Sequence, residues 1–334
     1  MPSSSVRTFT DPDTYHAAIR AQQVEGVVTA RGNFCSELTR VDFDRLQMQG
    51  ADENLARVLN VTTTRERVGV FFATGQSQPA LRAGGIALSR REIITWGSGL
   101  AGHHRSEAAC RWGSVSLTQD HLIAAGNSII GRELTPPTFP YRIRPPGPVL
   151  ARMTNLHETA AHLAKSAPDI LANPEVARAI EQALIEVMIL SLAGGDPVDA
   201  RSAHRHHHAV MRRLEEVLQA SSEEPLYMTE LCKAAGASYR TLRDCCQEHL
   251  GMSPKRYLWL RRMHLARRAL RSADAEATTV TEIATGCGFW ELGRFAVAYR
   301  SLFGESPSTA LRRPPEDATP GDNAASPWKF ADTA

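Results

Sequence analysis

Short apolar runs separated by glycine or charged residues mark the first part of the chain. The runs are Val68–Phe72, Gly85–Leu88, Ile93–Trp96 and Val115–Leu117, and apolar residues partly alternate with polar ones over Gly32–Met48. Short strands separated by turn residues are typical of an all-β sandwich or barrel. A cluster of prolines between positions 136 and 148 then breaks regular structure. We therefore predict that residues 1–148 form a β-rich region.

Helical periodicity begins after these prolines. Leu150, Met153 and Leu156 fall close to helical spacing, and Val176–Leu192 is a second apolar run with the same period. Because helices this apolar need a partner, we predict that Val176–Leu192 packs either on the β-rich region or against a second copy of the chain. We expect 149–195 to be a helical, candidate dimerisation region and 196–209 to be a linker. Residues 314–334, rich in proline and polar residues, are expected to be a disordered tail.

Residues 210–313 are predicted to be helical, and they contain an internal repeat. The segment MTELCKAAGASYRTLRDCCQEHLGMSP, residues 228–254, is followed by VTEIATGCGFWELGRFAVAYRSLFGESP, residues 280–307. Leu242, Cys246 and Leu250 of the first copy match Phe295, Tyr299 and Phe303 of the second, and both copies end in Gly-x-Ser-Pro. The repeat predicts two copies of one helical unit.

Each copy has the layout of a helix-turn-helix unit. In the first, Thr229 is the expected N-cap of a short helix whose inner face includes Ala234, and Gly236 supplies the backbone freedom for the turn. Ser238 is then expected to cap the second helix, whose outer face is left free to enter a major groove. In the second copy, the corresponding recognition helix is predicted over Trp290–Arg300.

The segment between the two copies is predicted to be one continuous helix, Pro254–Arg271. Tyr257, Leu260 and either His264 or Leu265 form one face, and basic residues form the other. We expect these arginines to contact DNA phosphates.

Two such units joined by one helix, with IATGCGF and RFAVAYRSLFGESP in the second, resemble the AraC/XylS family of bacterial transcription regulators. The resemblance covers both copies and the helix between them. It implies that the two recognition helices insert into adjacent major-groove segments on one face of double-stranded DNA.

The outward positions of these two helices are therefore the candidate DNA contacts. In the first helix they are Ser238, Tyr239, Arg240, Arg243 and Gln247. In the second helix the charged candidates are Glu291, Arg294 and Arg300, of which the two arginines could instead be solvated surface charges. Arginine offers a bidentate fork to guanine, whereas the apolar outward residues of the second helix can meet thymine methyls and read little else. We hypothesise that the first unit supplies most of the base specificity.

The charge distribution is compatible with a nucleic-acid partner. The 334 residues carry a net charge of only +2, but Pro225–Arg313 holds 14 basic and 8 acidic residues, a balance of +6, which leaves −4 for the rest. A basic segment on a slightly acidic body suggests a polyanionic partner for that segment. The 43% hydrophobic and 22% charged residues are typical of a globular protein long enough for two domains.

The front half adds a second resemblance. RGNFCSELTRVDFDRLQMQ is similar to the cupin-like sensory domains of such regulators, which commonly bind a small effector and pair two chains. The implied fold is α+β: a β-rich cupin-like sensory domain with C-terminal helices, followed by an all-α domain of two helix-turn-helix units. The implied function is that of a sequence-specific transcription regulator, an activator, that responds to an unidentified effector. Its expected partners are RNA polymerase and a second copy of the chain in a homodimer.

Two histidine clusters have the residue types of metal ligands. His103, His104, Glu107 and Cys110 have ligand residue types but lack a cupin metal pattern, and His204 with His206–His208 lies in the expected linker. We therefore predict no metal, no cofactor and no catalytic residue. The alternatives are an enzyme fused to a DNA-binding domain, and a constitutive regulator whose front domain only dimerises.

The cysteines and the apolar runs bear on the compartment. The six cysteines form no CxxC pair, as expected for reduced thiols. No apolar run reaches 18 residues and residues 1–10 lack an apolar signal core, so a cytoplasmic protein without a membrane segment is expected.

Overall fold

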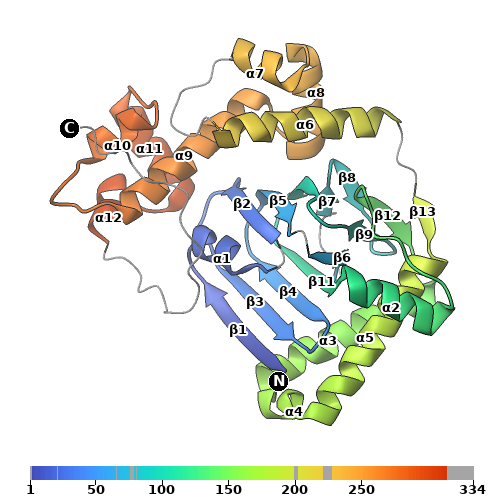
Figure 1. The fold of residues 1–334 in the computed structure, drawn as a ribbon. Coiled ribbons are helices and arrows are strands. Elements are labelled where there is room, and N and C mark those ends of the chain that lie inside the picture. The colour runs from blue at the N-terminus through green and yellow to red at the C-terminus, as the bar shows by residue number, and fades with distance from the viewer. Residues whose placement is uncertain are drawn as a thin grey trace.

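The computed structural model in Figure 1 describes residues 2–20, 22–64, 66–75, 79, 81–198, 202–220 and 228–313. A β-rich front part comes first, helices α2–α5 cover one side of it, and a separate group of helices follows on the opposite side. This arrangement confirms the predicted α+β order. The expected tail, 314–334, lies outside the described residues.

The front part contains two antiparallel sheets. The eight-stranded sheet has the order β1 (Ser3–Phe9), β3 (Ser36–Asp42), β4 (Gln47–Glu53), β11 (Cys110–Thr118), β6 (Arg67–Ala73), β9 (Ile93–Trp96), β12 (Tyr141–Arg144) and β13 (Asp196–Val198). The five-stranded sheet has the order β2 (Gln22–Val28), β5 (Arg57–Thr63), β10 (Ala101–Ser106), β7 (Leu81–Ala83) and β8 (Ile86–Leu88). Helix α1 (Pro12–Ala18) lies between β1 and β2 in the chain.

The apolar runs of the sequence correspond to only part of this sheet structure. The four short runs fall within or overlap β6, β8, β9 and β11, and Gly32–Met48 covers β3 and the start of β4. Strands β2, β5 and β10 and helix α1 were not predicted. The sequence of β10, AGHHRS, has no apolar alternation because its two histidines serve opposite faces of the strand, as described below.

Two apolar cores hold the front part together. One lies between the sheets and contains Phe71 and Trp96 of the larger sheet together with Leu81 and Leu88 of the smaller sheet. The other lies between the larger sheet and the helices that cover its outer face. These helices are α2 (Gln119–Ile130), α3 (Gly147–Ser166), α4 (Pro168–Ala172) and α5 (Pro174–Gly194).

The apolar face of α5 is used inside the chain. Leu184, Val187 and Met188 are fully buried in the core that α5 shares with α3 and the sheet. Packing on the β-rich region, one of the two predicted alternatives, therefore accounts for the apolar run Val176–Leu192. A dimer contact through the same buried residues would require this core to open.

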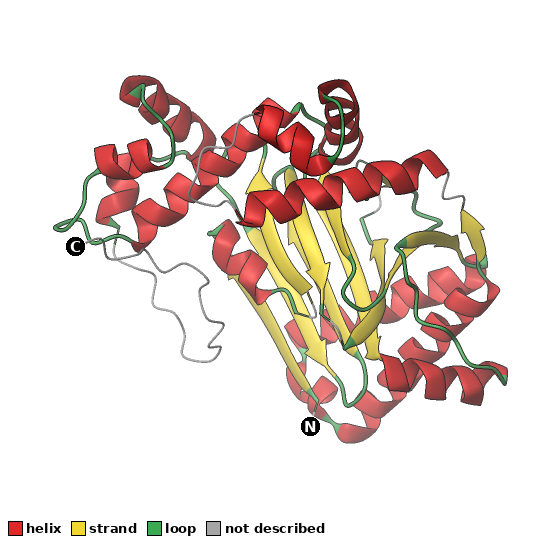
Figure 2. Cartoon of the chain, turned by 45° about the horizontal axis from the view of Figure 1, so that its top comes forward, coloured by secondary structure: helices red, strands yellow, loops and turns green. Residues whose placement is uncertain are grey.

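The expected linker over 196–209 is largely replaced by regular structure. Asp196–Val198 forms β13, which pairs with β12 at the edge of the larger sheet, and α6 (Ser202–Ala220) begins shortly afterwards. Helix formation is explained by an apolar face at helical spacing, because Val210, Met211, Leu214 and Leu218 are all buried. Figure 2 shows α6 lying across the ends of the strands, between the sheets and the remaining helices.

Candidate nucleic-acid interface

The remaining helices form two units at the two ends of one long helix (Figure 1). Helices α7 (Met228–Ala235) and α8 (Tyr239–Leu250) form the first unit, and α10 (Val280–Gly286) and α11 (Leu292–Phe303) form the second. The long helix is α9 (Pro254–Ser272), and α12 (Pro307–Arg312) follows the second unit. The sequence prediction of a doubled unit joined by a continuous helix therefore agrees with the structure.

The first unit is a capped turn between two short helices. Gly236 has a φ of +62°, which residues with a side chain rarely adopt, and the hydroxyl of Ser238 accepts a hydrogen bond of 3.1 Å from the backbone N–H of Thr241. Two details of the prediction were wrong. Thr229 lies inside α7 rather than at its N-cap, and Ala234 is exposed because Ala235 faces the core.

The buried side of α8 leaves its predicted contact residues free. Leu242, Cys246 and Leu250 lie in the helical core, which fixes the rotation of the helix about its axis. Consequently the opposite face is exposed, and it carries Ser238, Tyr239, Arg240, Arg243 and Gln247. These five side chains lie on one accessible surface, from the N-cap of α8 to its last turn.

The repeated Gly-x-Ser-Pro sequence has a specific structural task in both units. Gly251 and Gly304 end α8 and α11 in the left-handed conformation, with φ values of +72° and +75°. The serine that follows is the N-cap of the next helix, and the proline occupies the first turn of that helix, where its missing N–H costs no hydrogen bond. The motif thus ends each recognition helix and starts the next helix.

The second unit begins with a capping box. The Thr279 hydroxyl accepts from the backbone N–H of Glu282, and the Glu282 carboxylate accepts from the backbone N–H of Thr279 at 2.8 Å. Helix α11 starts at Leu292, so the predicted start at Trp290 was two residues too early. Phe295 and Tyr299 hold its inner face in the core.

The outer face of α11 is more apolar and less charged than that of α8. Glu291, Arg294 and Arg300 are all exposed, but Arg294 pairs with Glu291 at 2.9 Å, which offsets its charge. Trp290 is 79% exposed and Val297 is 72% exposed. The sequence prediction missed the exposure of Trp290, because a tryptophan beside a turn is more often a core residue.

Helix α9 has its predicted apolar face but not its predicted basic face. Tyr257, Leu260 and His264 are buried, so His264 rather than Leu265 completes the inner stripe. Arg267 is also buried, and it pairs with Asp11 at 2.7 Å. The expectation that the arginines of this helix contact phosphates is therefore wrong for Arg267 in this arrangement.

Two carboxylates of the front part hold three arginines of α9. Asp11 pairs with Arg267 and Arg271, and Asp13 pairs with Arg267 at 3.5 Å and with Arg268 at 3.1 Å. Asp11 is also the N-cap of α1, where its other carboxylate oxygen accepts from two backbone N–H groups. Sequence reasoning could not find this cluster, because its members lie at opposite ends of the chain.

A second polar cluster joins α6 to both parts of the chain. The buried Glu215 carboxylate binds His103 of β10 at 3.0 Å, the hydroxyl of Tyr257 at 2.8 Å and Arg261 at 3.0 Å. Burial acts to raise the pKa of Glu215, but the hydrogen bond and charge of His103, with Arg261, outweigh it and lower the pKa. Glu215 is therefore held ionised where the two parts meet.

His103 does not join a metal site with its neighbours. His103 contacts Glu215, whereas the ring of His104 lies 4.9 Å from that of Phe71 between the sheets. In the part of the chain that the structure describes, no group of three or more His, Cys, Asp or Glu side chains is placed to hold a metal ion. No helix among the described residues is long and apolar enough to cross a membrane.

Comparison with known proteins connects the helical part to one family. Residues 231–313 match the family model described as a helix-turn-helix domain. The chain is 40% identical over 106 residues to the probable thc operon regulatory protein of Rhodococcus erythropolis, which is 32% of each protein. It is 36% identical over 101 residues to the XylDLEGF operon transcriptional activator of Pseudomonas putida, which is 30% of this chain and 32% of that protein. The chain thus matches about a third of the length of these curated relatives.

One solved structure is similar over a short range. It is that of a probable AraC family transcriptional regulator from Rhodopseudomonas palustris CGA009. The sequence identity is 36%, the match covers 30% of this chain and 94% of that chain, and the TM-score is 0.28. The match of residues 231–313, the doubled unit and the named relatives agree on one assignment. Residues 231–313 of this chain therefore form a helix-turn-helix domain of the AraC type.

Proposed function

We propose that this chain is a sequence-specific transcription regulator that binds double-stranded DNA through α8 and α11. The observation that carries the proposal is the exposed face of α8, where five hydrogen-bonding side chains lie on a helix fixed by a buried opposite face. Such a helix fits the major groove, and its two arginines can each offer two parallel hydrogen bonds to guanine. Matching relatives named as operon activators support activation as the outcome.

The two units contribute unequally in this proposal. Arg240 and Arg243 on α8 form no ion pair with any described residue, whereas Arg294 on α11 is held by Glu291. The exposed Trp290 and Val297 suit contacts with thymine methyl groups and sugar edges. Consequently α8 would select bases by hydrogen bonding, and α11 would add contact area with a weaker preference.

We further propose the partners of the chain and its compartment. The front part would bind a small effector, two copies would pair as a homodimer, and a bound copy would contact RNA polymerase in the cytoplasm. These partners follow from the family resemblance. Sedimentation of the purified chain with and without operator DNA tests the pairing.

The test of DNA recognition is selection from random duplexes by the full chain, followed by sequencing. The proposal predicts enrichment of one asymmetric site in which the better-defined half contains guanine. Binding that is equal for all duplexes and is lost with salt would show that charge alone drives it, and would contradict sequence-specific recognition.

A further inference from the structure

An acidic side chain lies on the exposed face of α8, among the candidate base contacts. Asp244 is two residues after Leu242 and two residues before Cys246, both of which are fully buried. Two residues along an α-helix correspond to a rotation of about 200°, so Asp244 lies on the side of α8 opposite its core. Arg240, one turn earlier, is exposed on the same side. The carboxylate of Asp244 is therefore part of the surface that would face DNA.

The two acidic residues of α8 have different surroundings. Glu248, in the last turn, lies with a carboxylate oxygen 2.5 Å from the Nδ1 of His207 on α6. Asp244 forms no ion pair or hydrogen bond through its carboxylate with any residue that the structure describes. Glu248 thus joins two helices of the chain, whereas the carboxylate of Asp244 is available to an outside partner.

Neither neighbouring arginine of α8 neutralises Asp244. Arg240 precedes it by four residues, and an arginine that precedes an acid by four is the less favourable order for an ion pair within a helix. The second unit differs, because Glu291 precedes Arg294 and holds it at 2.9 Å. On α8, acid and base are consequently both left to bind other groups, while on α11 they bind each other.

The chemistry of a carboxylate limits what it can bind in a major groove. When ionised, it accepts hydrogen bonds and donates none, and DNA phosphates repel it. Guanine and thymine present acceptors at the groove edge, and adenine presents the acceptor N7 beside its amine. Cytosine presents only the donor N4 amine, so it is the base whose edge an unpaired carboxylate fits best.

We propose that Asp244 is a specificity-determining residue that selects cytosine in the half of the site read by α8. The inference rests on the proposed function and names a base that this function leaves open. Arg240 and Asp244 are separated by about 6 Å along the helix axis. Since base pairs are stacked about 3.4 Å apart, the cytosine should lie within about two base pairs of the guanine read by Arg240.

Asp244 would also act against wrong sequences. With any other base opposite it, the carboxylate would lose water without gaining a donor, and the phosphates nearby would repel it. The residue therefore weakens binding to most duplexes and spares those with cytosine at one position. An acid used in this way increases discrimination while it lowers the affinity for DNA in general.

The experiment is selection from random duplexes by the full chain, followed by affinity measurements on the selected duplex. Loss of base preference in Arg240→Ala identifies the guanine that Arg240 reads. We expect a defined cytosine within about two base pairs of it, on either strand. Replacing this cytosine by another base should lower the affinity of the wild type about tenfold.

Two variants of Asp244 separate base reading from simple repulsion. Asp244→Ala should bind all four bases at that position nearly equally and should bind scrambled duplexes a fewfold more tightly, because a negative charge is gone. Asp244→Asn should change the preferred base from cytosine to adenine, since an amide can donate to N7 and accept from the N6 amine of adenine. The side chain is exposed, so neither variant removes a core contact.

The matched control is Glu230→Ala, which removes an exposed acidic side chain of the same unit from α7 instead of α8. It should keep the base preference of the wild type. An unchanged preference in both Asp244 variants, with affinity raised equally for all duplexes, would overturn the inference and leave only charge repulsion. Loss of preference at the guanine alone would make Asp244 a support for Arg240 and would also overturn it. A wild type that selects no sequence at all would contradict the proposed function itself, so the two failures are distinguishable.

Discussion

Asp11 and Arg267 form a buried ion pair at 2.7 Å that joins the first helix of the chain to the helix between the two DNA-binding units. Both side chains are 6% exposed. Since each charge has lost most of its contact with water, each depends on the other for compensation. The pair therefore fixes the position of the front part relative to α9.

Loss of one partner of this pair should be costly. Asp11→Asn keeps an oxygen for the N-cap of α1 but leaves Arg267 with the longer contact to Asp13, so we expect a loss of about 3 kcal/mol in the free energy of unfolding. Urea denaturation of the full chain measures it. The control is Asp13→Asn, whose side chain is more exposed and which should cost about 1 kcal/mol. Equal, small losses in both variants would mean that the contact between the two parts is not held by Asp11.

The close packing of two glycines around His157 predicts a steric effect of adding a side chain there. Gly50 and Gly113 face each other on β4 and β11, and a Cβ on Gly113 would lie 2.8 Å from both the His157 ring and Phe72. Gly113→Ala should therefore destabilise the chain by about 1–3 kcal/mol through overpacking. Gly147→Ala, where a Cβ would meet nothing within 4 Å, is the matched control and should be neutral. Thermal unfolding of both variants measures the change in stability. A Gly113→Ala variant as stable as the wild type would contradict the predicted overpacking and show that the core adapts.

The same histidine predicts a pH effect. Burial lowers the pKa of His157 to about 4, below the value of about 6.5 expected in the unfolded chain. The unfolded state then binds more protons between these two values, so the contribution of His157 is complete above about pH 6.5 and is lost as the pH falls toward 4. From pH 7 to pH 5 the expected loss is about 2 kcal/mol. His157→Gln should show a correspondingly smaller loss in urea denaturation, and an unchanged pH dependence would contradict the assignment.

Glu291 should weaken the attraction of α11 for DNA. Its carboxylate pairs with Arg294, and both side chains are exposed. Glu291→Gln should increase affinity for all duplexes a fewfold, without a change in base preference, because it removes a negative charge near phosphates. Glu186→Gln, which removes a similar exposed pair with Arg152 on the far helices, is the control and should change nothing. Fluorescence anisotropy at two salt concentrations measures both, and a changed base preference would place Glu291 at a base edge.

The sequence predicted the helical part better than the front part for a physical reason. In the helix-turn-helix units, local signals fix the structure: Gly236 makes the turn, Ser238 caps α8, and Gly251 ends it. In the front part, the decisive contacts are non-local, such as the pairing of Gly50 with Gly113 that makes room for His157. No local pattern encodes which glycines meet across a sheet.

The exposed face of α8 followed directly from its buried face, whereas the contacts of α6 with the front part could not be predicted. A helix with Leu242 and Cys246 inside must expose Arg243, so periodicity was sufficient. Glu215 and His208 of α6 contact β10, which lies far earlier in the chain, and the expected linker concealed His208 because α6 was not recognised. The clusters around Asp11 and Glu215 were not predicted either, because their members also lie far apart in the sequence.

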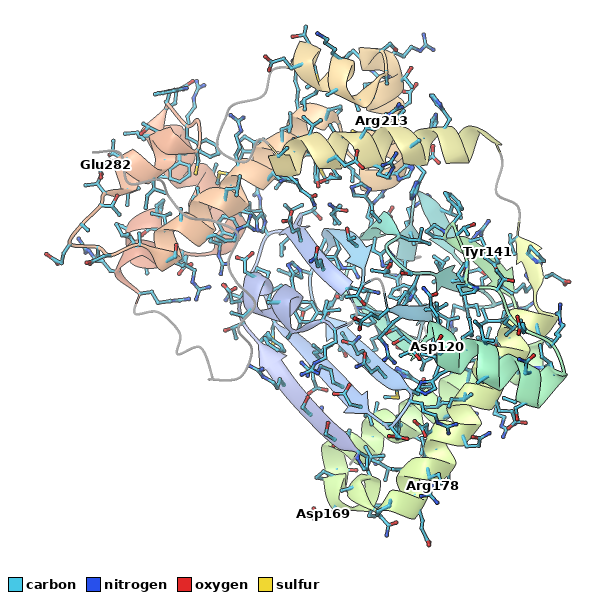
Figure 3. The ribbon with its side chains drawn as sticks, viewed as in Figure 1. Asp120, Tyr141, Asp169, Arg178, Arg213 and Glu282 are labelled. Atoms are coloured by element: carbon cyan, nitrogen blue, oxygen red, sulfur yellow. The ribbon has the colours of Figure 1, made fainter. Side chains whose placement is uncertain are left out.

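The most direct test of the account compares Arg243→Ala with Arg178→Ala on the duplex selected by the wild type. Both arginines are on exposed helix surfaces, but Arg178 lies on α5 at the opposite end of the molecule from Arg213 of α6, as Figure 3 shows. The measured quantity is the ratio of affinities for the selected duplex and for a scrambled one. We predict that Arg243→Ala lowers this ratio, by an amount equivalent to about 1–3 kcal/mol of discrimination, and relaxes the preference at one base pair. Arg178→Ala should retain the wild-type ratio. An unchanged ratio in Arg243→Ala, or equal losses in the two variants, would contradict base recognition by α8.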